Sequence, residues 1–85
     1  MAMFEDVVTM IKMIAEDRSV PRNIREKCNE IIGILQDSKE TIPIKINAAI
    51  STFDEISNDV NIPMYTRTQV WNIVSLLESK YKIME

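Results

Sequence analysis

The stretches Ser19-Val20-Pro21, Thr41-Ile42-Pro43 and Asn61-Ile62-Pro63 divide the chain into four segments of similar length. Each stretch places a small polar residue and a β-branched residue in front of a proline. Proline is tolerated in the first turn of a helix, because its φ is already close to helical and it has no N–H to leave unpaired. It also pushes the preceding residue toward extended backbone. We therefore predict that a helix begins at each stretch and that a fourth helix precedes the first one. Either the polar or the β-branched residue can serve as the N-cap.

The three prolines are 22 and 20 residues apart, which suits one helix and one short connection per segment. Such a repeat can indicate a solenoid with an extended binding surface. Repeat proteins usually repeat their core positions as well, and here we find repetition in the turn residues alone. The pattern therefore favours simple punctuation of helices over a functional repeat.

Apolar residues recur at helical spacing in every segment. This pattern predicts helices over residues 3–17, 21–37 and 43–57, and a fourth from residue 63 or 66 to residue 83. The predicted core stripes are Phe4, Val7, Val8, Ile11, Ile14 and Ala15; Ile24, Cys28, Ile31, Ile32 and Leu35; Ile46, Ala49, Ile50, Phe53 and Ile56; and Val70, Ile73, Val74, Leu77, Tyr81 and Met84. The later start of the fourth helix rests on Thr66 and Gln69, which have the spacing of a capping box.

Short connections make consecutive helices antiparallel neighbours. The sequence therefore predicts an all-α protein, an antiparallel four-helix up-and-down bundle formed by a single domain over residues 1–85. Gly33, the only glycine, falls inside the second predicted helix. Glycine there costs about 1 kcal/mol relative to alanine, and we expect a close helix crossing at Gly33 to offset that cost.

Composition narrows the classes of function. The chain of 85 residues has a net charge of −3 and a pI near 4.9, which disfavours general binding to nucleic acids or to anionic membranes. Its one cysteine, Cys28, forms no intrachain disulfide, falls on an apolar stripe and fits a reducing compartment. We see neither a basic-then-apolar leader nor an apolar run long enough to span a membrane. The expected location is cytoplasmic.

The residues needed for the commonest catalytic and metal sites are missing. The chain has no histidine and one cysteine, which removes the usual general base, the usual nucleophile pairs and the usual zinc ligands. We therefore predict a protein that is not an enzyme, with no catalytic residue, no metal site and no cofactor. An alternative is an enzyme that uses carboxylates and a metal from solution, at Asp54 and Glu55 or at Asp37 and Glu40, although we expect these four side chains to face water.

A basic cluster surrounds the first proline and consists of Arg18, Arg22 and Arg25. Arginines beside a helix start can hold a phosphate or a carboxylate, so this cluster is a candidate site for an anionic ligand or an RNA segment. The alternative is an exposed charged face that pairs with nearby acids such as Glu26 and contributes little.

Three apolar side chains are candidates for an interface. Met10 and Met13 widen the stripe of the first helix, and Trp71 lies away from the densest stripe of the fourth helix. Methionine faces adapt to varied partners, and tryptophan often anchors an interface. The alternative is that all three fill the core at helical spacing.

With these residues in view, the chain resembles a family of short archaeal proteins of uncharacterised function. The stretch from Val20 to Arg25 and the segment Ile62-Pro63 with Arg67 carry the resemblance, which extends over nearly the whole chain. It implies a four-helix up-and-down bundle with a bromodomain-like layout. It implies no activity and no functional residues, and a shared layout does not imply acetyl-lysine binding.

The sequence thus favours a small cytoplasmic protein-interaction module that forms a homodimer or binds another protein. Binding of an anionic ligand or RNA at Arg18, Arg22 and Arg25 is the alternative.

Overall fold

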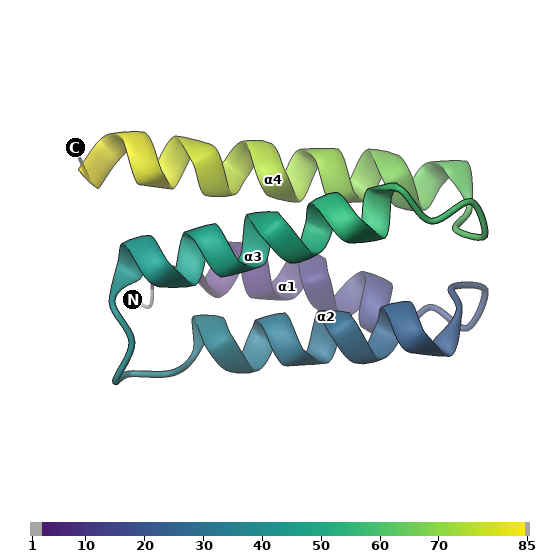
Figure 1. Ribbon diagram of the computed structural model, residues 1–85, viewed down its shortest axis with the longest axis horizontal. Helices are drawn as coiled ribbons and strands as arrows, with labels where there is room; N and C mark the ends of the chain where they lie inside the picture. Colours follow the sequence, from purple (N-terminus) through teal and green to yellow (C-terminus); the bar gives the residue numbers. More distant parts are fainter. Residues whose placement is uncertain (1–2, 85) are drawn as a thin grey trace.

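The computed structural model describes residues 3–84, which form four helices: α1 (Glu5–Ala15), α2 (Arg22–Leu35), α3 (Ile42–Ser57) and α4 (Met64–Met84). Figure 1 shows the helices running alternately up and down along the long axis of a body of 35 × 20 × 20 Å. Each helix packs against two neighbours, and the closing contact joins α1 to α4. The predicted all-α, antiparallel four-helix bundle is therefore confirmed.

The three connections between helices alternate between the two ends of the bundle (Figure 1). The α1–α2 and α3–α4 turns lie together at one end, on the right in Figure 1. The α2–α3 connection lies at the other end, beside the start of α1 and the end of α4. This arrangement makes the molecule a pair of helical hairpins, α1–α2 and α3–α4.

The prolines mark three helix starts, but in two different ways. Pro21 occupies the N-cap position of α2, and its carbonyl accepts hydrogen bonds from the N–H groups of Ile24 and Arg25. Pro63 accepts the corresponding bonds at the start of α4. By contrast, α3 begins at Ile42 with Thr41 as its N-cap, so that Pro43 lies inside the first turn. Thr41 is thus the polar N-cap that we considered, whereas neither Ser19 nor Val20 is the N-cap of α2.

The predicted capping box of α4 is wrong. The helix begins at Met64, which places Thr66 within its first turn, where the side chain is completely buried. The Thr66 hydroxyl and the Gln69 carboxamide oxygen are buried without a hydrogen-bond partner among the described residues. Thr66 therefore faces the core.

The core is built from the four predicted stripes, extended at the turns by Val20 and Ile62. Ile50, Val74 and Tyr81 are half-buried against it. The prediction for Met84 lies outside the described side chains. Gly33 departs from the expectation, because it is exposed and a methyl group at its Cα would meet nothing within 4 Å. A close crossing therefore does not explain the glycine.

The core positions do repeat, with a period of 42 residues, which corrects our conclusion from the sequence. Every buried residue from Phe4 to Leu35 has a buried or half-buried counterpart 42 positions later, in the same place in the second hairpin. Identical residues occupy both places at six positions, which are Ile14 and Ile56, Asp17 and Asp59, Pro21 and Pro63, Arg25 and Arg67, Ile31 and Ile73, and Leu35 and Leu77. The middle proline has no place in this repeat. The structural unit is therefore one helical hairpin, present twice.

Candidate functional site

Both predicted sites lie toward the end of the bundle that carries the α1–α2 and α3–α4 turns. In each of these two turns, an aspartate carboxylate accepts a hydrogen bond from the backbone N–H of the second residue after it. Asp17 accepts from the Ser19 N–H at 2.9 Å, and Asp59 accepts from the Asn61 N–H at 2.8 Å. Such Asx turns are a common local conformation for aspartate and leave the following residues extended. The two turns therefore have similar backbone conformations, and their flanking side chains occupy equivalent positions.

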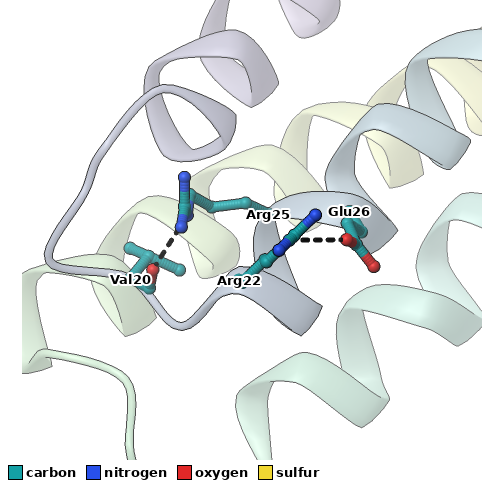
Figure 2. Close-up of polar contacts among 4 residues, drawn as sticks. All are labelled: Val20, Arg22, Arg25 and Glu26. Atoms are coloured by element: carbon teal, nitrogen blue, oxygen red, sulfur yellow. Dashed lines mark hydrogen bonds and ion pairs between the residues drawn. The ribbon is translucent and has the colours of Figure 1, made fainter.

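The arginine cluster is largely engaged within the chain (Figure 2). Arg25 is half-buried, and its Nε donates to the Val20 carbonyl oxygen at 3.1 Å, so that its side chain folds back over the turn. Arg22 points away from Arg25, and its Nε pairs with a Glu26 carboxylate oxygen at 3.1 Å. Arg18 is exposed. The structure thus places the three residues around one turn but directs two of the guanidinium groups to different intramolecular partners. Anion binding here stays a prediction.

Tyr65 joins the two hairpins at this end. Its hydroxyl donates to Asp17 Oδ2 at 2.6 Å and lies 2.5 Å from Ser19 Oγ. The Ser19 hydroxyl donates to Asp17 Oδ1 at 2.6 Å. Together with the bonds from Tyr65 and from the Ser19 N–H, this bond lowers the pKa of the Asp17 carboxyl below its ordinary value of 3.8. Tyr65 therefore acts as a tie between the start of α4 and the α1–α2 turn.

The predicted interface residues differ in how exposed they are. Met10 is half-buried against the core, whereas Met13 on α1 and Trp71 on α4 are 60% and 65% exposed. Two further residues that we did not select, Val60 and Met64, are more exposed than either, at 84% and 82%. Met64 and Trp71 are seven residues apart on α4, which places them on one face of the helix, and Val60 precedes them in the turn. We call Val60, Met64 and Trp71 the apolar stripe.

The apolar stripe stands out when the two hairpins are aligned by the 42-residue repeat. Val60 and Met64 occupy the places that Arg18 and Arg22 hold in the first hairpin. These positions are exposed in both hairpins, yet they are charged in the first and apolar in the second. Core packing does not require an apolar side chain there, so Val60 and Met64 are candidates for contact with a partner. The arginine cluster and the apolar stripe thus share two equivalent positions, whereas Arg25 corresponds to Arg67 and Trp71 to Asn29.

The carboxylates and the cysteine are the candidate metal ligands of this chain, which has no histidine. Among residues 3–84 no group of three potential ligands comes together. The four carboxylates that we singled out, Asp37, Glu40, Asp54 and Glu55, are all exposed. Cys28 is completely buried, and this burial raises the pKa of its thiol to about 11, so that the nucleophilic thiolate is disfavoured. None of the four helices is both long and apolar enough to cross a membrane over its described residues.

Comparison with known proteins gives a single family. The model of the uncharacterised protein family UPF0147 matches residues 1–79. A UPF0147 protein of Methanosarcina mazei is 44% identical over 70 residues, which cover 82% of this chain and 75% of that protein. A UPF0147 protein of Methanocaldococcus jannaschii is 48% identical over 75 residues, which cover 85% and 77% of the two chains.

Solved structures agree with these relatives. The crystal structure of a UPF0147 protein from Thermoplasma acidophilum superposes with a TM-score of 0.86 at 28% identity and covers 91% of each chain. The crystal structure of MMP1188, a protein of unknown function, has a TM-score of 0.84 at 38% identity and covers 89% of this chain and 86% of that one. The resemblance to short archaeal proteins is therefore confirmed, and the chain belongs to the uncharacterised protein family UPF0147.

Proposed function

We propose that the protein is a cytoplasmic, non-enzymatic interaction module that binds a protein surface through the apolar stripe. The observation that carries this proposal is the exposure of Val60, Met64 and Trp71, whose side chains are between 65% and 84% accessible on one half of α4 and its turn. Exposed aromatic and methionine side chains are the residue types that anchor interfaces. The repeat supports the proposal, because the first hairpin folds with Arg18, Arg22 and Asn29 in these places.

A second copy of the chain is the first partner to test. Three side chains cover much less area than a permanent dimer interface needs, so we expect association with a Kd in the micromolar range or weaker. Trp71 is the only tryptophan in the chain. Its emission therefore reports directly on whether its own ring becomes buried.

The experiment combines light scattering with tryptophan emission over a concentration series. We expect the mass to rise at high concentration while the emission of Trp71 shifts to shorter wavelength. Met64→Ser should weaken both changes, whereas Ile44→Ser, which alters an exposed residue at the opposite end of the bundle, should leave them intact. A monomer at all concentrations moves the test to other partners from the same cells, captured with the wild-type protein and compared with Met64→Ser. Equal capture by both proteins refutes the proposal.

The arginine alternative has weaker support. Arg25 holds the turn and Arg22 pairs with Glu26, so an anion has to compete with contacts already made in the folded chain. The direct check is titration with phosphate or a short RNA at low salt. Binding that is lost when Arg18 and Arg22 are both changed to Gln would favour this function over the interaction module.

A further inference from the structure

A hollow of about 540 Å³ opens at the end of the bundle opposite the apolar stripe. Its walls come from the start of α1, the end of α2 and the start of α3. Phe4, Val8, Leu35 and Ile42 give it an apolar surface, and Lys12 and Lys45 are also among its lining residues. We call this space the lysine hollow. Its volume lies in the range of pockets that hold small molecules.

Lys45 is the unusual residue of the lysine hollow. Only 9% of it is exposed, although lysine is almost never buried without a partner. Three ion pairs form among the described side chains, and none of them includes Lys45. Its ammonium lies 5.9 Å from the centre of the Phe4 ring, at the outer limit of a cation–π contact. A lysine that lines a pocket and has no anion within ion-pair distance among the described side chains attracts a negative group to that pocket.

The charge around the lysine hollow differs from that of the whole chain. Lys12 and Lys45 are opposed by one acidic residue of the lining, Glu5, which leaves an excess of one positive charge in a chain of net charge −3. The N-termini of α1 and α3 also lie at this end, and the side chain of Thr41, the N-cap of α3, accepts no hydrogen bond from its helix. Helix N-termini carry partial positive charge, which adds to that of the lysines, whereas the C-terminus of α2 opposes it.

The second hairpin shows why the lysine hollow is open. Its equivalent space is lined by Ile46 and Ile50, the counterparts of Phe4 and Val8, but measures only about 240 Å³. There α4 continues past Leu77 and brings Tyr81 over the space. Because α2 ends at Leu35, it supplies no such cover. The same site in the fold is thus narrowed by the chain itself in one hairpin and left open in the other.

We propose that the lysine hollow binds an organic monoanion with an apolar body, of the kind represented by a medium-chain carboxylate. The charged group is held by Lys45 and Lys12, and the apolar body packs against Phe4, Val8 and Leu35. A neutral or cationic molecule of the same shape lacks the first of these interactions. This site is independent of the apolar stripe, so either proposal can fail while the other stands.

The test is titration of the protein with octanoate at low salt, followed by NMR of the backbone amides. We expect the resonances of residues around Phe4, Thr9 and Ile42 to shift, and the affinity to fall as salt is added. Octan-1-ol should bind at least about tenfold more weakly, because it offers no charge to the lysines, and octylammonium should bind more weakly still. Absence of shifts at about 10 mM octanoate, or equal binding of the alcohol, overturns the proposal.

Two variants and a control locate the site. Lys45→Met keeps the apolar stem and removes the charge, and we expect it to weaken octanoate binding about tenfold. Thr9→Trp places a large side chain at the exposed rim and should block binding without disturbing the core. Lys82→Met makes the same charge change beside the narrower space of the second hairpin and should have no effect. The assignment of octanoate to the lysine hollow is contradicted if Lys45→Met and Lys82→Met bind octanoate equally well. It is also contradicted if Thr9→Trp folds and binds octanoate as well as the wild type.

Discussion

The two helical hairpins share a plan and differ in what they present to the solvent. Both end a helix at an Asx turn, start the next at a proline, and return an arginine to the turn: Arg25 to the Val20 carbonyl and Arg67 to the Asp59 carbonyl. Their buried positions also correspond, but their exposed side chains differ. Where the first hairpin exposes Arg18 and Arg22, the second exposes Val60 and Met64.

The opposite end of the bundle shows a second difference. The first hairpin leaves the lysine hollow open, and the second narrows the equivalent space by lengthening α4. The comparison separates residues that are needed for folding from residues that are free to differ. Positions retained in both hairpins report on the turn and the core, whereas positions that differ between them are the candidates for function.

The arginines of the turns should give the largest effect. Arg25→Met and Arg67→Met each remove a charged donor from a turn carbonyl, and we expect each to lower the free energy of unfolding by about 1–2 kcal/mol. Arg22→Met, which breaks only an exposed pair with Glu26, should cost less than about 0.5 kcal/mol. Urea unfolding measures all three values.

The outcome bears on both the repeat and the arginine cluster. Similar losses for Arg25→Met and Arg67→Met support a shared role in the two turns. If Arg25→Met is neutral while Arg67→Met is costly, the turns are not equivalent, and Arg25 becomes available for the anion-binding role that we consider less supported.

A substitution at Thr66 should give a smaller effect, and it should raise rather than lower the free energy of unfolding. Thr66 occupies the place of Ile24, is completely buried, and its hydroxyl has no partner among the described residues. An unpaired buried hydroxyl is unfavourable, so Thr66→Val should raise the free energy of unfolding by about 1 kcal/mol. Thermal unfolding measures this change in stability. The control is Thr68→Val, which alters an exposed threonine on the same helix. Destabilisation by Thr66→Val indicates that the hydroxyl is paired in solution, for example with a buried water.

The features that were predictable from the sequence are those that depend on neighbouring residues along the chain. Apolar spacing located all four helices and almost the whole core, and proline placed three helix starts to within one residue. The choice of N-cap was not predictable, because proline itself can occupy that position when its carbonyl accepts the first helical bonds. The Thr66 and Gln69 spacing misled us, since a capping box also requires that its threonine lie outside the helix.

The candidate sites were less accessible from the sequence. The three arginines lie within eight positions of one another in the sequence, and so we could group them, but their hydrogen bonds depend on the folded turn. The lysine hollow joins Lys12 on α1 to Lys45 on α3, which only the packed helices bring together. The 42-residue repeat was present in the sequence, but with six identical pairs it becomes clear only when burial aligns the hairpins.

Tyr65 should give the smallest effect, and one that depends on pH. It takes the place of Asn23 in the first hairpin, so the tie to Asp17 has no counterpart on the other side. Because hydrogen bonds from Ser19 and Tyr65 hold the pKa of Asp17 below 3.8, the ionised carboxylate stabilises the fold above that pH, and this contribution is lost as pH falls through the lower folded value.

Tyr65→Phe removes one of these donors while keeping the ring. We expect the pKa of Asp17 to rise toward 3.8, which NMR titration of its carboxyl group can follow. The variant should be slightly less stable than the wild type at neutral pH, and the difference should shrink below about pH 4, where the carboxylate is protonated in the unfolded chain. A difference that is constant with pH assigns the role of Tyr65 to packing of its ring. An unchanged pKa of Asp17 shows that the Ser19 donors suffice to hold it low, and that the Tyr65 hydroxyl contributes little to the ionised carboxylate.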